Sequence, residues 1–524
     1  MQKQLITYLE YLKHPTLIAI VIALLTTGFL RLQLSIYPPA SDSGIYAFSS
    51  QWFFNAISQD IPIKDSKLFL YQFMTAWVYG MEVNQTILLR LIDGLVAIAA
   101  SFVLFKVILK ESGSIPFTII LMAPLLIILH DFNYVIYGFR NSIWAAYLPL
   151  FTALLLWQKS SKEDNFSFYL IGALVSLGIL LREAFLPFFL LTLIAIYISY
   201  GRRPSLKFMA GSALLGFSVI GFILIFRDWD LYNLIDKYIS QVAAYKDYKD
   251  IIGLNFTSGI LYLMKTGWFI CILALASILY FVKIKFKDKK STNVNRFCFW
   301  ILVALLPLIE PIFKLGFHYH YSNCLIGLGG LSAIGYKYLS LHESKQIKKS
   351  SIILIGLISL FIILPVVNSK VVTKVGKNRI VTPSDLIEGV MNFDYFRRPE
   401  LIETNQYLSL ASKIYSLARE DSTLVLTGGM QVLYPLTDML PPTYELSWLR
   451  YLYIKLNFDD SKLIKIISKH RPTLIVTTDW HPGEAAMSKI IDKIDLYEKI
   501  QVIPVNPEKT YGWKSGTIYR LKDF

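Results

Sequence analysis

Cysteine and charged residues are both scarce in this chain. Only three of the 524 residues are cysteines, too few for a disulfide scaffold, and all three lie in apolar runs. Charged residues make up 17% of the chain, whereas ordinary soluble domains contain about 25%. Because 54% of the residues are hydrophobic, a soluble fold would have too few polar side chains to cover its surface. The composition excludes a cytosolic enzyme, a disulfide-rich secreted protein and a disordered or fibrous chain.

Long apolar runs dominate the first 370 residues. A helix needs about 20 apolar residues to span a bilayer, and eleven runs approach or reach that length. They lie at about 15–34, 86–109, 115–130, 142–157, 166–181, 184–200, 207–226, 260–282, 297–313, 321–336 and 351–367. The first run is too long for a removed signal peptide and lacks a clear small-residue cleavage site. The sequence predicts a multi-pass integral membrane protein.

The net charge of +15 follows from an uneven distribution of Lys and Arg between the predicted loops. With a cytoplasmic N-terminus, the short inner segments carry 19 basic residues and the longer outer segments carry 10. Such a bias is typical of cytoplasmic loops. We therefore expect a cytoplasmic N-terminus, and the positive charge requires no nucleic-acid partner.

Three polar stretches interrupt the apolar pattern: outer loops at about 35–85 and 227–259, and a tail that begins near 370. The tail has helical patterns near 400–419 and 460–470. Its predicted strands are 423–427, 473–478, 498–504 and 516–521. We predict a mainly α fold in which residues 1–369 form a transmembrane helical bundle and residues 370–524 a small extracytoplasmic α/β domain.

The first outer loop carries two carboxylates that are candidates for catalysis. Asp42 and Asp65 both lie where a loop meets the predicted membrane surface. A carboxylate at such a position can act as a general base for a hydroxyl or amine. Asp42 can equally cap a helix that starts at Ser43 or Gly44, because aspartate is a favoured N-cap residue. The two roles are compatible.

The order of residues in this loop resembles the first outer loop of GT-C superfamily glycosyltransferases. The matching elements are Asp42 and Tyr46, then Ile61-Pro62 and Asp65, then Lys67-Leu68. The likeness is greatest to the branch that contains the protein O-mannosyltransferases and the lipid A aminoarabinose transferase. Two features depart from that branch: the prolines expected after the lysine are missing, and Ser41 and Ser43 replace an acidic partner of the aspartate.

The resemblance implies an enzyme of the bacterial inner membrane, with its active site on the extracytoplasmic side. It would transfer a sugar, with inversion, from a polyprenyl-phosphate donor to a glycan, lipid or protein acceptor, without a metal or another cofactor. Asp42 would be the base, with Asp65 as the second candidate. The substrate-binding candidates are Tyr46, Lys67, Arg140, Arg182, Lys314, His318, His320 and Tyr321.

The basic candidates would meet the lipid phosphate as it leaves, since a developing anion is stabilised by nearby cations. Relatives often have His-x-Arg-Tyr where this chain has His318-Tyr319-His320-Tyr321. A histidine with an ordinary pKa of about 6.5 is a weaker cation than arginine, so the role of His320 is open.

Structural roles are open for the same residues. Arg140 can anchor the chain at the lipid headgroups, Arg182 can pair with Glu183, and the two histidines can be interfacial side chains or metal ligands. In the second apolar run, Arg90 and Asp93 are three residues apart and are expected to neutralise each other.

Two other functions remain for the whole chain. One is a transporter or flippase for lipid-linked sugars, although transporters usually contain internal repeats and none is visible here. The other is a non-catalytic partner in polymer assembly, because a glycosyltransferase fold can lose its activity.

Overall fold

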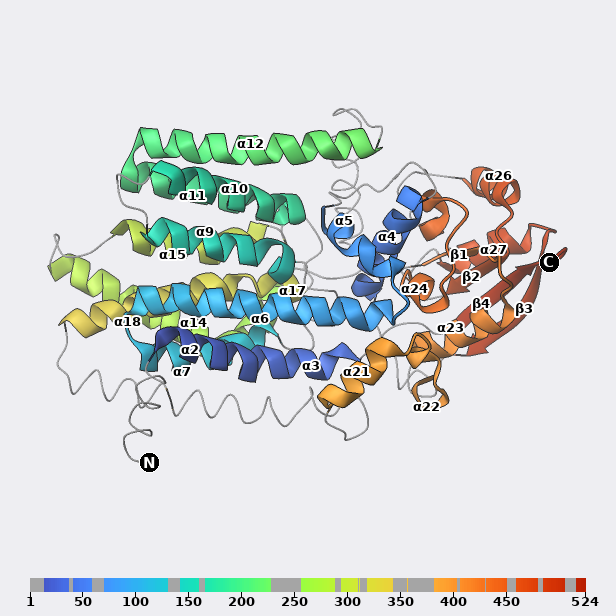
Figure 1. Ribbon diagram of the computed structural model, residues 1–524, viewed down its shortest axis with the longest axis horizontal. Coiled ribbons are helices and arrows are strands. Elements are labelled where there is room, and N and C mark those ends of the chain that lie inside the picture. Colours follow the sequence, from blue (N-terminus) through green and yellow to red (C-terminus); the bar gives the residue numbers. More distant parts are fainter. Residues whose placement is uncertain are drawn as a thin grey trace.

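The computed structural model describes most of the chain. The described residues are 14–36, 41–58, 70–130, 142–159, 165–227, 256–287, 294–309, 311, 318–342, 356, 381–402, 406–428, 430–449, 459–478, 484–504 and 515–524. They form a long helical bundle and a C-terminal α/β unit at one end of it (Figure 1). We call that end of the bundle, where α3 ends at Ser35 and α6 begins at Gln85, the junction end.

The helices of the bundle follow the predicted apolar runs. They are α2 (Pro15–Ile22), η1 (Ala23–Gly28), α3 (Phe29–Ser35), α6 (Gln85–Ser112), α7 (Ile115–Leu129), η3 (Ser142–Tyr147), α9 (Leu148–Lys159), α10 (Asn165–Leu181), η4 (Glu183–Phe185), α11 (Leu186–Tyr200), α12 (Arg202–Arg227), α14 (Phe256–Lys287), α15 (Val294–Leu305), η5 (Leu306–Leu308), α17 (His318–Tyr321) and α18 (Cys324–His342). Ten of the eleven predicted runs are thereby confirmed as helical. The eleventh, 351–367, lies outside the described residues apart from Gly356.

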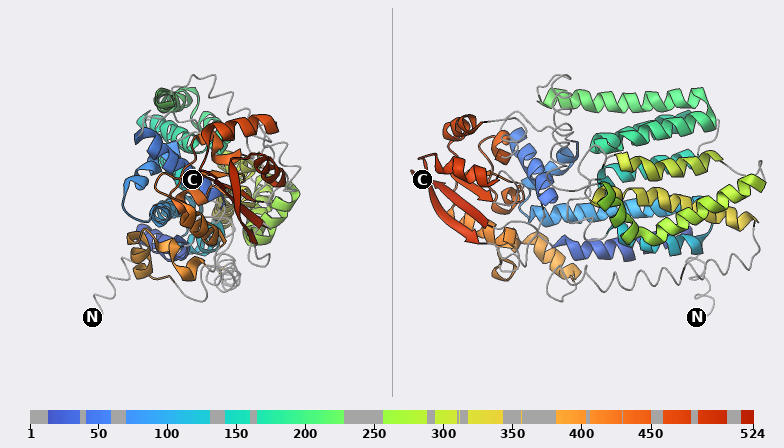
Figure 2. Two further views of the ribbon diagram at one scale, coloured as in Figure 1. Left: turned by 90° about the vertical axis from the view of Figure 1, so that its right-hand side faces the viewer. Right: turned by 180° about the vertical axis from the view of Figure 1, so that it is seen from behind.

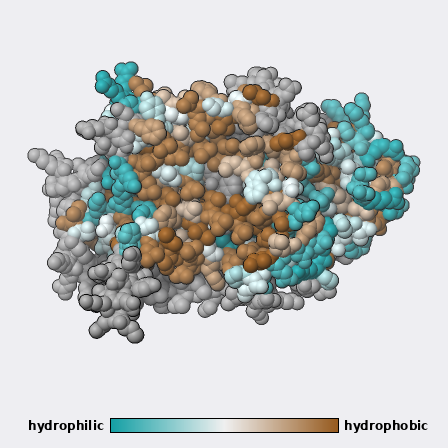
Figure 3. Space-filling model, viewed as in Figure 1, coloured by the Kyte–Doolittle hydropathy of each residue, from teal (hydrophilic) through white to brown (hydrophobic). Residues whose placement is uncertain are grey.

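The bundle has the dimensions and surface of a membrane domain. Within the described ranges, six helices are long and apolar enough to cross a bilayer. They are Pro15–Ser35, Gln85–Ser112, Glu183–Tyr200, Arg202–Phe222, Phe256–Lys283 and Cys324–Leu341. Apolar residues cover the visible face of the bundle, whereas polar residues gather on the C-terminal unit (Figure 3). The chain is a multi-pass integral membrane protein.

Small residues bring the bundle helices into close contact, as at the crossing of α10 and α12. A Cβ atom added to Gly172 would lie 2.1 Å from the carbonyl oxygen of Phe208, and one added to Gly211 would lie 2.1 Å from that of Tyr169. The Ser212 hydroxyl donates across the same crossing to the Gly172 carbonyl, at 2.8 Å. Helices in lipid associate through such small and weakly polar residues, because lipid chains leave no hydrophobic effect to drive them together.

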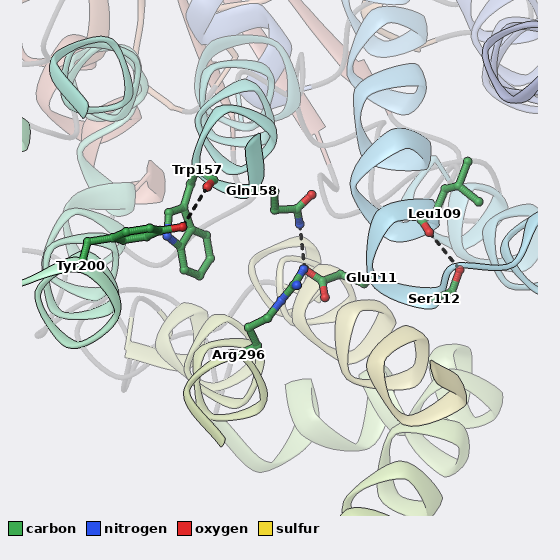
Figure 4. A network of polar contacts seen from close by, with 7 residues as sticks. All are labelled: Leu109, Glu111, Ser112, Trp157, Gln158, Tyr200 and Arg296. Carbon is green, nitrogen blue, oxygen red and sulfur yellow. Dashed lines mark hydrogen bonds and ion pairs between the residues drawn. The ribbon is translucent and has the colours of Figure 1, made fainter. Parts of the chain in front are cut away.

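A buried carboxylate joins three helices at the end of the bundle remote from the C-terminal unit (Figure 4). Glu111 of α6 has a side chain that is only 1% exposed. Its Oε1 accepts from Arg296 Nη2 of α15, at 2.6 Å, and from Gln158 Nε2 of α9, at 2.7 Å. Since an unpaired buried charge is costly, these two contacts hold α9 and α15 against α6.

The C-terminal unit is a four-stranded mixed sheet with helices on both faces. Its strands are β1 (Leu424–Leu426), β2 (Leu474–Thr478), β3 (Tyr497–Pro504) and β4 (Ser515–Leu521). The order is β1-β2-β4-β3, with β1 and β2 parallel and the other two pairs antiparallel. The predicted strands are confirmed, as are helices within both predicted helical patterns. Side chains alternate between two cores: Leu424 and Leu426 enter one, and Val425 enters the other.

Within the described residues, eight helices surround this sheet or lead into it. They are α21 (Pro383–Met391), η6 (Tyr395–Arg397), α22 (Pro399–Ile402), α23 (Gln406–Leu417), α24 (Leu433–Thr437), η7 (Tyr444–Trp448), α26 (Asp460–His470) and α27 (Glu484–Asp492). Figure 2 shows the molecule end-on and from behind. The C-terminal unit lies over the junction end, and its sheet is on the side away from the bundle.

The first loop supplies helices that lie between the bundle and the C-terminal unit. They are α4 (Ser41–Ser58), α5 (Leu70–Ala76) and η2 (Trp77–Gly80). Phe48, Trp52 and Phe53 of α4 belong to the same hydrophobic core as Leu424 and Leu426 of β1. The loop that follows the first spanning helix thus shares a core with residues nearly 400 positions later.

Candidate functional site

Asp42 lies in the first turn of α4, which is already helical at Ser41. The expected helix start at Ser43 or Gly44 is therefore wrong, and Asp42 is inside the helix instead of at its N-cap. An acidic residue in a first turn interacts favourably with the helix dipole. The structure describes the backbone of Asp42 alone, and Figure 1 shows α4, the helix that carries it, between the bundle and the C-terminal unit.

Gly44 brings the start of α4 against the backbone of the C-terminal unit. A Cβ atom at this position would lie 2.4 Å from both N and Cα of Val432, the residue just before α24. Only a residue without a side chain allows this approach. Asp42 is two residues away, so the contact helps to determine where the candidate base lies.

Further along α4, one face of the helix packs on the C-terminal unit. The ring centroids of Phe48 and Tyr434 are 4.4 Å apart, and those of Trp52 and Tyr444 are 5.7 Å apart. Gln51 Nε2 donates to Asp438 Oδ1 at 3.0 Å. Burial raises the pKa of Asp438, while the positive charge of Arg397 and the Gln51 hydrogen bond oppose that rise.

The opposite face of α4 packs on the bundle side of the junction. Tyr46, four residues after Asp42, makes an edge-on contact with Tyr71 of α5, with ring centroids 5.5 Å apart. The Ser50 and Thr75 hydroxyl oxygens are 2.7 Å apart and share a hydrogen bond. Tyr46 also packs against a small cluster that includes Leu181, the residue before Arg182. The structure therefore brings two candidates, Tyr46 and Arg182, to the same region.

A buried ion pair, which sequence reasoning missed, lies beneath this region. Arg31 Nη1 of α3 is 2.5 Å from Asp93 Oδ2 of α6, and the two side chains are 5% and 4% exposed. Arg90 Nη1 donates to the Leu34 carbonyl at 3.4 Å. Arg31 is therefore a partner of Asp93 that comes from another helix, and the expected pairing of Asp93 with Arg90 stays a prediction. Burial raises the pKa of Tyr71, and the nearby Asp93 raises it further.

The remaining described candidates lie at neighbouring helix ends. His320 is buried in α17, and the Tyr321 hydroxyl donates to the Phe256 carbonyl at 3.2 Å. The Tyr147 hydroxyl donates to Asn323 Oδ1. The ring centroids of Tyr147 and Phe185 are 5.0 Å apart, and Phe185 lies three residues after Arg182. These contacts connect the segment with His320 and Tyr321 to the turn with Arg182.

Four candidates lie outside the described residues: Asp65, Lys67, Arg140 and Lys314. For His318, only the backbone position in α17 is described. In the described ranges, no three His, Cys, Asp or Glu side chains are grouped as a metal site would require.

Comparison with known proteins identifies the fold. No protein-family model matches this sequence, and no curated protein sequence matches it. Among solved structures, the archaeal oligosaccharyltransferase AglB from Archaeoglobus fulgidus, in complex with an inhibitory peptide and a dolichol-phosphate, is similar, with a TM-score of 0.52 and 11% identity. The match covers 96% of this chain and 74% of AglB.

A second structure is of the Archaeoglobus fulgidus oligosaccharyltransferase tethered with an acceptor peptide that contains the NVT sequon. That match covers 96% of this chain and 74% of the other, with 13% identity and a TM-score of 0.49. Because the AglB sequence is only 11% identical to this one, the similarity shows the fold alone. The expected GT-C-like architecture is confirmed, whereas the O-mannosyltransferase branch stays a prediction.

Proposed function

We propose that this protein is an integral-membrane glycosyltransferase that uses a polyprenyl-phosphate sugar as donor. The observation that carries the proposal is the position of Asp42. It lies in the first turn of a helix that is held between a membrane bundle and a C-terminal α/β unit, in a GT-C-like fold. The dolichol-phosphate in the similar AglB structure supports a lipid-phosphate donor. A glycan, lipid or protein then serves as acceptor on the extracytoplasmic side.

In this proposal Asp42 removes a proton from an acceptor hydroxyl or amine. The acceptor oxygen or nitrogen forms a bond to the anomeric carbon, while the bond from that carbon to the phosphate oxygen breaks. The lipid phosphate leaves with the electron pair, and the configuration at the anomeric carbon inverts. A positioned general base of this kind contributes a factor of about 10²–10⁴ to the rate.

The departing phosphate needs positive charge at the junction end. Arg182 and His320 are candidates there, because the helix ends that carry them are connected through Tyr147. Lys67, Arg140, Lys314 and His318 stay candidates from the sequence, and Tyr46 and Tyr321 would shape the substrate site. We add Arg31, because charged residues buried in a membrane domain commonly have functional roles. Its Nε and Nη2 atoms are buried and make no hydrogen bond within the described residues.

The orientation and the domain division belong to the same proposal. The N-terminus then faces the cytoplasm, as the excess of 19 over 10 basic residues predicts, and residues 370–524 form an extracytoplasmic domain. The membrane is the bacterial inner membrane in this proposal, because polyprenyl-phosphate sugars are used at its outer face in the enzymes that the first loop resembles.

The replacement Asp42→Asn tests the proposal. Asparagine has nearly the same shape, and the helix loses only a first-turn charge, typically about 0.3–1 kcal/mol. Sugar transfer from a polyprenyl-phosphate hexose should fall by about 10²–10⁴, in membranes with matched protein levels. Asp460→Asn is the matched control, because Asp460 is an exposed first-turn aspartate of α26, and it should leave transfer unchanged.

Asp65→Asn distinguishes the two candidate bases. An active Asp42→Asn protein together with an inactive Asp65→Asn protein would assign the base to Asp65. If both variants keep full activity, the glycosyltransferase proposal loses its main support. Binding of polyprenyl phosphate, measured by native mass spectrometry, should persist in Asp42→Asn, because the base does not hold the leaving group.

A further inference from the structure

Both ends of α21 are hydrogen-bonded to membrane-spanning helices at the junction end. Before its first turn, the Val381 N–H donates to Gln33 Oε1 at 2.9 Å, and Gln33 Nε2 donates to the Val381 carbonyl at 3.2 Å. Beyond its last turn, Asn84 Nδ2 donates to the Phe393 carbonyl at 3.2 Å, and the Asn84 N–H donates to the Val390 carbonyl at 2.8 Å. Figure 1 shows α21 beside the end of α3.

These partners determine the depth of α21 in the membrane. Gln33 lies two residues before the end of the span Pro15–Ser35, and Asn84 is the N-cap of α6, whose span begins at Gln85. A spanning helix begins and ends close to the lipid–water boundary. Since α21 is bonded to both helices where they reach that boundary, it lies at the level of the lipid headgroups.

The two sides of α21 differ in what covers them. On the inner side a Cβ atom at Gly389 would lie 2.9 Å from Ile87 Cδ1, and Leu386 and Val390 pack against the core shared with α4. On the outer side Ile387 and Met391, four residues apart, are 65% and 69% exposed. A helix in contact with water usually has polar residues on its exposed face.

Exposed apolar side chains also lie on the first spanning helix and just after α21. Leu25 and Phe29, in the first spanning helix to which α21 is bonded, are 71% and 39% exposed. Phe393, just after α21, is 42% exposed. Nearby, Arg398 pairs with Glu388 at 2.7 Å, and Arg397 lies 3.7 Å from the ring centroid of Tyr415. Aromatic rings and arginines are typical of the membrane interface.

We propose that α21 is an interfacial membrane helix whose Ile387 and Met391 side chains lie in the lipid leaflet next to the junction end. The occupant of this surface is the bilayer, because hydrogen bonds hold α21 at the ends of two spanning helices, at the level of the lipid headgroups. The helix would hold the C-terminal unit against the membrane. The inference depends on the membrane assignment and is independent of the proposed transferase activity.

Spin labels on the full-length protein in phosphatidylcholine–phosphatidylglycerol vesicles test this. Labels are attached to single cysteines at Ile387 and Met391, after the three native cysteines are replaced by alanine. Leu214 of α12, 75% exposed, is the lipid reference, and the exposed Lys465 of α26 is the water reference. Collisions with oxygen, which concentrates in lipid, are compared with collisions with a water-soluble nickel chelate.

We expect labels at both test positions to collide more with oxygen than with nickel, as at Leu214, and the reverse at Lys465. Two test positions guard against a single variant that disturbs the fold, which gel filtration would reveal. Nickel collisions as frequent at Ile387 and Met391 as at Lys465 would overturn the proposal. Protection from both reagents would overturn it as well, because a protein partner or a second copy would then cover the patch.

Discussion

Replacing Gly44 by alanine tests whether the C-terminal unit places the candidate base. The added Cβ atom would lie 2.4 Å from the N and Cα atoms of Val432 and 2.5 Å from its Cβ, whereas ordinary contacts begin at 3.4 Å. Because two of these three atoms are backbone, no side-chain rotation relieves the clash. The start of α4 and the segment before α24 therefore have to separate by about 1 Å, the difference between 3.4 and 2.4 Å.

The expected effects on stability and on rate differ in size. Overpacking of this kind typically costs about 1–3 kcal/mol, and alanine regains up to about 1 kcal/mol over glycine within a helix. The net loss of about 0–3 kcal/mol leaves a protein of ordinary stability folded. A displacement of about 1 Å in a catalytic group can lower the rate by about 10²-fold. Gly44→Ala should therefore yield a folded, membrane-inserted protein with strongly reduced turnover.

The assay compares kcat and donor KM for sugar transfer in Gly44→Ala and in Gly221→Ala, at matched protein levels. Gly221 is a helical glycine of α12 with open space around its added Cβ, so its replacement controls for the change of residue type. We expect kcat to fall in the first variant alone, with donor KM nearly unchanged. Equal activity in the two variants would refute the idea that this contact places Asp42.

Two further predictions concern carboxylates that are hydrogen-bonded to side chains of other helices. Burial raises the pKa of Asp438, so its contribution to stability is present in acid and is lost as the pH rises through the folded-state pKa. Asp438→Asn keeps an acceptor for Gln51, and asparagine suits the positive φ of 56° at this position. The midpoint of thermal unfolding should therefore rise at pH 7, and the gain should shrink toward about pH 4. An equal gain at both pH values would contradict this. At the remote end of the bundle, Arg296→Leu leaves the Glu111 carboxylate with the Gln158 amide as a hydrogen-bond partner. Loss of one partner of a buried pair costs about 3–5 kcal/mol, and less here because Arg296 is 30% exposed. Glu111→Gln combined with Arg296→Leu should recover most of that loss in thermal unfolding; a double variant no more stable than the single one would contradict the prediction.

Local patterns in the sequence were enough to predict most of the secondary structure. Each described spanning helix coincides with an apolar run, because a bilayer requires a continuous apolar helix. The strand predicted at 473–478 is observed as Leu474–Thr478, since short apolar, β-branched runs between turns favour strands. Both signals depend only on neighbouring residues and are therefore visible without an alignment.

The candidate site was harder to predict because its contacts join distant segments. The sequence predicted a helix that starts at Ser43 or Gly44, whereas α4 starts at Ser41, and the role of Asp42 stays a prediction. The same reasoning paired Asp93 with Arg90, its neighbour on one helix, because spacing within a helix is visible in a sequence and packing between helices is not. One observed partner, Arg31, lies 62 positions earlier. Arg31 was a recognisable clue, since an arginine within an apolar run is expected to have a buried partner.

The same reasoning applies to the connection between the bundle and the C-terminal unit. Gln33 and Val381 are 348 residues apart, yet they exchange two hydrogen bonds. Gln33 is 1% exposed in a membrane-spanning helix, and a buried amide without partners would destabilise the fold. Its presence therefore requires a polar backbone segment beside the spanning helix, and Val381 provides one. Because α4 and α21 both pack into the core of the C-terminal unit, the first loop and the tail have to be folded together before Asp42 reaches its place.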